Sequence, residues 1–190
     1  MKKLNEGVAP VIILCVICLL STALLAFTNE LTMEKREANK AAAIMASKKG
    51  IFPEAAQFED LQIPANLTEI FSMANVAKNE AGEVLGYLVQ TSAKGYGGKV
   101  NALVGFDKEY KVKGIDFPDQ QETAGLGAKI AEPAFQSQFP GKSMAESFSL
   151  GDGSGNTVDA ISGATISSTA VVNALNLSVE NLQALLGGKE

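Results

Sequence analysis

The 190-residue chain contains no histidine and no tryptophan, and it has only two cysteines. Without histidine it cannot form a Ser-His-Asp triad, a histidine-ligated haem or the usual histidine-containing zinc site. Positive charge is also scarce, because 16 Lys and Arg stand against 21 Asp and Glu. A nucleic-acid-binding protein needs a basic surface that displaces counterions, so we expect no nucleic-acid partner. Any chemistry must come from the backbone, hydroxyls, carboxylates or a bound cofactor.

One long uncharged run, Val8–Phe27, stands near the amino terminus. A run of about 20 residues in a helix spans about 30 Å, the thickness of the bilayer hydrocarbon core. The alternative is a cleavable signal peptide, since Lys2 and Lys3 resemble its basic start. The apolar run is long for a signal peptide and no A-x-A cleavage site is evident, so we favour a retained anchor. Basic residues flank the run on both sides and do not decide its orientation.

Both cysteines, Cys15 and Cys18, lie within this run. Three positions apart, they share one face of a helix. A metal or iron–sulfur site needs about four ligands, and the chain has no further cysteine. We interpret them as small apolar residues in lipid or at a helix contact, the alternative being a site completed by another chain's ligands.

The segment after the run, Asn29–Lys49, is charged and rich in alanine, which predicts a helical stalk ended by Gly50 and Pro53. The length of the chain suits one domain with an appendage. We therefore divide it into an amino-terminal tip with a membrane anchor, a helical stalk with connector, and a folded domain: residues 1–28, 29–66 and 67–190.

The folded domain has the pattern of an α+β protein, with a mainly antiparallel sheet packed by helices. Consecutive strands joined by short turns favour antiparallel pairing. The predicted strands are Glu69–Ala77, Glu83–Thr91, Lys99–Phe106, Lys111–Phe117 and Asn156–Ile161. A short helix is predicted at Pro133–Gln138. The clearest helix is the last, ended by Gly187 and Gly188, and its apolar residues recur at helical spacing: Val172, Leu175, Val179, Leu182 and Leu186.

A cluster of small and hydroxyl residues precedes that helix. A strand is expected to end in the tight turn Ser162-Gly163-Ala164, directly before Thr165. Helix amino termini leave free N–H groups and positive potential, which suit a phosphate. From these residues alone, a capped helix and a weak phosphate site both remain open.

The stretch Asp159 to Thr165, Asp-x-x-Ser-Gly-Ala-Thr, resembles the flavinylation motif of the FMN-binding domain in the G subunit of Rnf complexes. The C subunit of sodium-translocating NADH:quinone reductase contains the same domain. In that family the motif threonine carries FMN through a phosphoester, installed by a flavin transferase of the ApbE type. The resemblance places the bond on Thr165, whereas Ser167 and Ser168 are alternatives by chemistry alone.

Two more segments resemble the family in the expected order. Residues 94–98, Lys-Gly-Tyr-Gly-Gly, are similar to its glycine-rich segment between central strands. Residues 122–127, Glu-Thr-Ala-Gly-Leu-Gly, are similar to its E-T-P-G-L-G signature, with Ala124 in place of proline. Gln120 stands where members often have histidine, so a proton-handling role does not carry over to it. The resemblance covers roughly residues 1–186.

The signature suggests roles around a flavin. Gly125 and Gly127 would let the backbone approach a flat ring, with Leu126 as an apolar contact. The alternative for these glycines is an ordinary turn after a strand. Thr123 can hydrogen-bond to the ring, and Glu122 can orient the loop.

Three further residues have two interpretations each. Lys129 either lies near the flavin and favours its anionic reduced form or is a solvated lysine. Tyr96 either packs on the cofactor or closes the core. Asp159 either belongs to the motif that the transferase recognises or caps the turn.

The resemblance implies an electron-relay subunit of an ion-translocating ferredoxin:NAD⁺ oxidoreductase, with covalent FMN as cofactor. It implies an amino terminus inside the cell and the FMN domain on the outer face of the cytoplasmic membrane. The partners implied are other flavin, iron–sulfur and integral-membrane subunits of the complex. The chain would belong to a translocase but carry electrons without substrate turnover of its own. The alternatives are the C subunit of a quinone reductase, a stand-alone anchored flavoprotein and a non-redox anchored adaptor.

Overall fold

The computed structural model describes the backbone of residues 2–151, 153 and 155–187, and the side chains of these residues from Val8 onward. The chain divides into two compact units, residues up to Ala42 and residues from Ala43 onward. Gly188, predicted to help end the last helix, lies outside the described residues.

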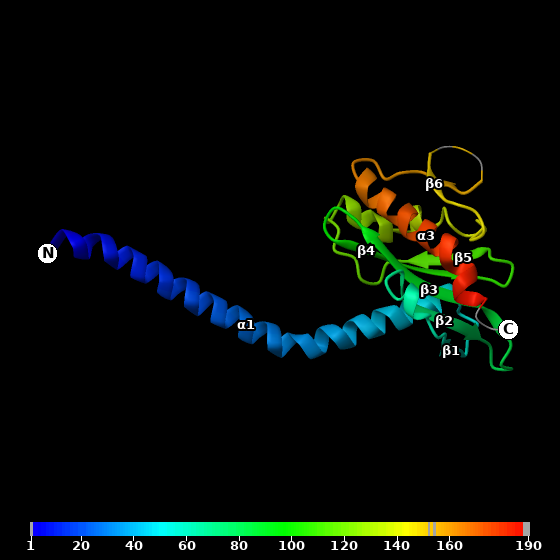
Figure 1. Cartoon of the computed structure of the whole chain (residues 1–190), viewed down its shortest axis with the longest axis horizontal. Helices are drawn as coiled ribbons and strands as arrows, with labels where there is room; N and C mark the ends of the chain where they lie inside the picture. Colours follow the sequence, from blue (N-terminus) through cyan, green and yellow to red (C-terminus); the bar gives the residue numbers. More distant parts are fainter. Residues whose placement is uncertain (1, 152, 154, 188–190) are drawn as a thin grey trace. The chain divides into compact units, whose positions relative to one another are not determined.

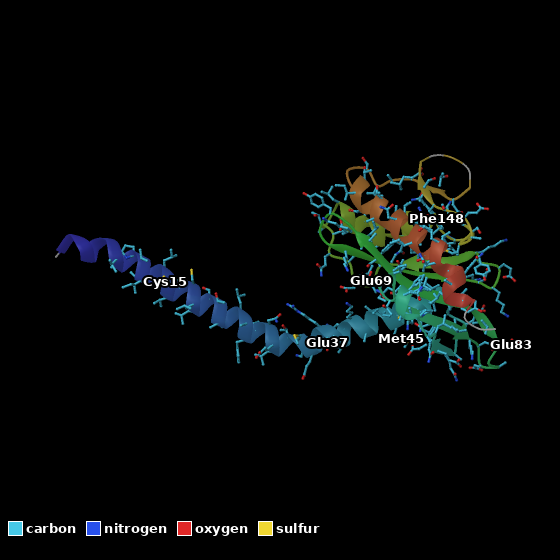
Figure 2. The ribbon with its side chains drawn as sticks, in the orientation of Figure 1. Cys15, Glu37, Met45, Glu69, Glu83 and Phe148 are labelled. Atoms are coloured by element: carbon cyan, nitrogen blue, oxygen red, sulfur yellow. The ribbon has the colours of Figure 1, made fainter. Side chains whose placement is uncertain are left out.

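One continuous helix, α1 (Lys2–Ile51), contains both the predicted anchor and the predicted stalk. Among the residues that the structure describes, it is the one helix long and apolar enough to cross a membrane. Its apolar stretch is exposed, as is Cys15, whose side chain points away from the helix in Figure 2. Within that stretch the Thr22 hydroxyl donates to the Cys18 carbonyl at 2.8 Å, so it needs no external partner. The helix ends one residue after Gly50, because Pro53 disfavours helical backbone at the residue before it.

The second unit is built on a five-stranded sheet whose strands follow the chain order and pair antiparallel (Figure 1). This confirms the predicted fold class. The strands are β1 (Gln57–Asp60), β2 (Phe71–Lys78), β3 (Val84–Lys94), β4 (Lys99–Phe106) and β5 (Val112–Asp116). β1 was not predicted: its four residues are mostly exposed and show no alternating burial.

One face of the sheet carries the main core and packs against α3 (Thr165–Leu186), which lies across β3 and β4 (Figure 1). On β4, Val100, Ala102 and Val104 face this core, while Leu103 between them faces the other side. The predicted apolar stripe of the last helix is confirmed, because Leu175 and Leu182 are buried against the sheet.

The opposite face is covered by the chain that leaves α1, centred on Phe52. Two glycines make room for its ring. A Cβ atom at Gly86 would lie 2.8 Å from Phe52 Cζ, and one at Gly105 would lie 2.8 Å from Phe52 Cε2. Both distances are too short for a real contact, so the packing of this segment depends on glycine in the two central strands.

The remaining elements are short. They are η1 (Ala65–Leu67), η2 (Gly127–Ala131), α2 (Pro133–Gln136), β6 (Ser149–Leu150) and β7 (Thr157–Val158). The predicted strand Asn156–Ile161 was too long, since only β7 is strand, and it pairs parallel with β6. Asn156, the first residue of the predicted strand, instead donates its side-chain amide to the Ser143 and Glu146 carbonyls.

Candidate functional site

A cavity of about 580 Å³ lies at the amino terminus of α3. The loop between β3 and β4 and the loop before η2 form its other walls. Eight of the residues singled out in the sequence line it: Tyr96, Glu122, Thr123, Leu126, Gly127, Gly163, Ala164 and Thr165. Ser167, considered in the sequence only as an alternative attachment point, also lines it, as does Ile166, which sequence reasoning missed.

The start of α3 has no side-chain cap within the described part of the chain. Gly163, at φ +77°, makes the left-handed turn that brings the chain into the helix. Ala164 follows as the N-cap, and its side chain has no oxygen to accept a hydrogen bond. The capped-helix interpretation is therefore wrong, and the first N–H groups of α3 give the cavity a positive pole.

The hydroxyl groups at this helix start differ in access. Thr165 is exposed, whereas Ser167 and Ser168 are 2% and 0% exposed. Ser168 donates to the Ala164 carbonyl at 3.1 Å. Ser167 donates to Glu122 at 2.5 Å. Of the three hydroxyls considered as attachment points, Thr165 is the accessible one.

Glu122 is a nearly buried carboxylate in the cavity wall, 8% exposed. Its Oε1 accepts the N–H of Gly97 at 3.0 Å, and its Oε2 accepts the hydroxyl of Ser167. The side-chain oxygen of Gln120 accepts the N–H of Glu122 at 2.7 Å. The polar part of the wall is thus a connected network rather than a set of free groups.

The rim of the cavity is apolar and accessible. Tyr96, Leu126 and Ile166 are 73%, 48% and 55% exposed. Three large side chains with apolar surface around one opening suit a flat aromatic ligand. Ile166 could have been found from the sequence, because it is a large apolar residue in the first turn of α3 that falls off the helix's apolar stripe.

Four of the residues singled out in the sequence, Asp159, Ser162, Gly125 and Lys129, are not among the described residues that line the cavity. Asp159 is exposed, and its backbone N–H donates to Gln138 Oε1 at 2.7 Å. Ser162 is exposed in the turn before Gly163. Lys129 is exposed on η2, and Gly125 makes a left-handed turn at φ +77° in the adjoining loop.

Comparison with known proteins agrees with this arrangement. The family described as "FMN-binding domain" matches residues 95–180, which contain both loops and most of α3. The G subunit of the ion-translocating oxidoreductase complex of Methanosarcina acetivorans is 35% identical over 98% of this chain and 100% of its own length. The chain belongs to this family of G subunits. A second relative, the G subunit of the Na⁺-translocating ferredoxin:NAD⁺ oxidoreductase complex of Acetobacterium woodii, is 34% identical over 92% of this chain and 90% of its own.

Solved structures support the fold of this G subunit. The C subunit of the Na⁺-translocating NADH-quinone reductase of Parabacteroides distasonis aligns with a TM-score of 0.50 and 30% identity, over 60% of this chain and 62% of that one. NqrC of Shewanella oneidensis aligns with a TM-score of 0.55 and 20% identity, over 72% of each chain. At that lower identity the second likeness concerns the fold alone.

The residues of the cavity fit FMN. The rim offers apolar surface to the isoalloxazine ring, and the uncapped helix start offers N–H groups and positive potential to the phosphate. Among the described residues, no group of three metal-ligating side chains is found.

Proposed function

We propose that this chain, as a G subunit, carries FMN on the Oγ1 atom of Thr165, through a phosphoester, and relays electrons in an ion-translocating ferredoxin:NAD⁺ oxidoreductase complex. The observation that carries the attachment is the accessible Thr165 hydroxyl, which lines the cavity while Ser167 and Ser168 are buried. A phosphate held there would lie at the positive end of α3, where N–H groups are free to bind it.

The residues of the chain bind and orient the cofactor rather than act on a substrate. Bound FMN supplies the redox chemistry, because it exchanges one or two electrons. Tyr96, Leu126 and Ile166 would cover the ring, and the Thr123 hydroxyl is a donor or acceptor for its polar edge. A covalent tether keeps the ring at high effective concentration in a cavity whose rim is open to solvent.

We also propose how the chain is placed and matured. Helix α1 would anchor it once in the cytoplasmic membrane, with the amino terminus inside and the FMN domain on the outer face. The exposed apolar stretch of α1 would then lie in lipid or against integral-membrane subunits of the complex. A flavin transferase of the ApbE type would install FMN, recognising the motif from Asp159 to Thr165, whose first side chain is exposed.

The test is coexpression of the full chain with a flavin transferase, followed by denaturing electrophoresis and flavin fluorescence of the band. Wild type is compared with Thr165→Ala and with the matched control Thr169→Ala, an exposed threonine one turn further along α3. We expect fluorescence in wild type and control and none in Thr165→Ala. Fluorescence in Thr165→Ala would contradict attachment at this residue. No fluorescence in any sample, with a transferase active on another substrate, would contradict covalent FMN.

A further inference from the structure

The buried carboxylate of Glu122 joins three separate segments of the site. Through Gly97 it holds the loop between β3 and β4, and through Ser167 it holds the first turn of α3. Its own backbone belongs to the loop that precedes η2. Each oxygen accepts one hydrogen bond from a neutral donor, as suits an ionised carboxylate, which can only accept.

Neighbouring glycines pack so closely against Glu122 that they leave no room for a Cβ atom. A Cβ atom at Gly127 would lie 2.6 Å from Glu122 Oε2, and one at Gly95 would collide with Oε1. A Cβ atom at Gly97 would collide with the carbonyl of Gln121, the residue before Glu122. Three glycines of the two family segments therefore make the close approach to this residue possible, which gives them a role distinct from contact with a flavin.

The bond to Ser167 also fixes how α3 presents its first turn. Residues two apart on a helix are about 200° apart around its axis. With Ser167 held inward by Glu122, Thr165 is directed outward, in agreement with their burial and exposure. A residue 45 positions earlier in the chain thus holds the helix start in the orientation that exposes Thr165, together with the packing of α3 on the sheet.

We propose that Glu122 is the positioning residue of the flavin site: it orients the start of α3 so that Thr165 is presented for modification. Its carboxylate also places a fixed negative charge beside the cofactor, and this charge lowers the reduction potential of the flavin. The inference rests on the proposed function. Reduction adds negative charge to the flavin, and a carboxylate held in the cavity wall opposes that addition. Being nearly buried, this charge is screened by solvent less than a surface carboxylate.

Two variants separate the charge from the hydrogen bond. Glu122→Gln keeps the size of the side chain and removes the charge. Ser167→Ala keeps the charge and removes one bond. The matched control is Glu132→Gln, an exposed carboxylate between η2 and α2 whose charge is screened. All are made in the full chain, in detergent, with and without transferase.

Three readouts are measured: the initial rate of covalent FMN attachment, the midpoint potential of the attached flavin, and the amide NMR signal of Gly97 in the protein without flavin. We expect Glu122→Gln to favour reduction about tenfold, equivalent to about +30 mV for two electrons. Ser167→Ala should keep the wild-type potential but attach FMN about fivefold more slowly, as the loss of one hydrogen bond implies. Glu132→Gln should match wild type, and the Gly97 amide should shift in Glu122→Gln.

An unchanged potential in Glu122→Gln, or a wild-type attachment rate in Ser167→Ala, would overturn the proposal while leaving covalent FMN intact. If Glu122→Gln does not fold, the attachment rate of Ser167→Ala decides the positioning role. If wild type takes up no FMN, the proposed function fails instead. The Gly97 amide still tests the carboxylate contact, and an unchanged signal in a folded Glu122→Gln protein would overturn it.

Discussion

The hydroxyl of Ser47, near the end of α1, donates a hydrogen bond of 2.6 Å to Asp116, the last residue of β5. The same carboxylate accepts the side-chain amide of Gln136 in α2 and the N–H of Phe117, both at 2.8 Å. Asp116 therefore ties the last turns of the long helix to the edge strand and to α2 within the second unit.

We predict that Asp116→Ala destabilises the second unit by about 2 kcal/mol, because the Phe117 N–H and the Gln136 amide lose their acceptor at a partly buried position and Ser47 keeps only its bond to the Ala43 carbonyl. The free energy of unfolding is measured by urea titration of the full chain in detergent. Glu80→Ala, an exposed acidic residue in the turn after β2, is the control and should change stability by less than about 0.5 kcal/mol. Equal stability of the two variants would show that Asp116 does not join these elements.

Gly163 makes a left-handed turn directly before Ala164 and Thr165 at the start of α3. At φ +77° an alanine there costs about 1–2 kcal/mol in backbone strain and shifts the turn that precedes Thr165. We expect Gly163→Ala to lower both stability and covalent FMN content. Gly50→Ala is the matched control, since Gly50 is helical with open space around its Cβ position, and it should stabilise the helix by about 0.5–1 kcal/mol. Wild-type FMN content in Gly163→Ala would contradict the prediction.

The sequence predicted those elements whose pattern is local. The central strands β3 and β4 alternate between two buried faces, and α3 carries an apolar stripe over about four turns, so each could be recognised alone. β1 could not, because its four residues become a strand only through pairing with β2. β6 was missed for the same reason, being two residues stabilised by the partner strand β7, which was predicted only as part of the longer strand Asn156–Ile161.

The position of the site could be predicted from the sequence, but the hydrogen bonds between its segments could not. Glycine and hydroxyl residues mark the two loops and the start of α3 in the sequence alone. The bond from Ser167 to Glu122 joins residues 45 positions apart and depends on how α3 rotates over the sheet, which no local pattern encodes. Ser167 was considered only as an alternative attachment point, and its burial argues against that role, while its bond to Glu122 gives it a structural one.

We expect the apolar rim of the cavity to restrict the motion of the flavin ring and to have no part in the covalent attachment. We predict that Ile166→Ser leaves covalent FMN content unchanged but lowers the fluorescence anisotropy of the attached flavin, because the ring loses apolar contact area and moves more freely. Ile166 is more than half exposed, so stability should change by less than about 1 kcal/mol. Met45→Ser, an exposed apolar residue on α1 (Figure 2), is the control and should leave anisotropy unchanged. Equal anisotropy in both variants would mean that Ile166 does not contact the ring.

The two cysteines on α1 allow a test of whether the membrane anchor serves only as an apolar helix. Both are exposed and share one helix face, but a metal centre would need about two more ligands from elsewhere. If they serve only as small apolar residues, the double variant Cys15→Ala with Cys18→Ala should reach the membrane fraction, keep its covalent FMN and copurify with the same integral-membrane subunits. Leu19→Arg is the contrasting variant, because a charge in the middle of the run costs about 2.5–3.5 kcal/mol in membrane insertion and should reduce the membrane fraction. Loss of copurifying subunits or of bound iron in the double alanine variant would instead indicate that the thiols complete a site with a partner chain. Alanine preserves the helix and its hydrophobicity and removes only the sulfur ligands, so such a loss is assigned to the thiols.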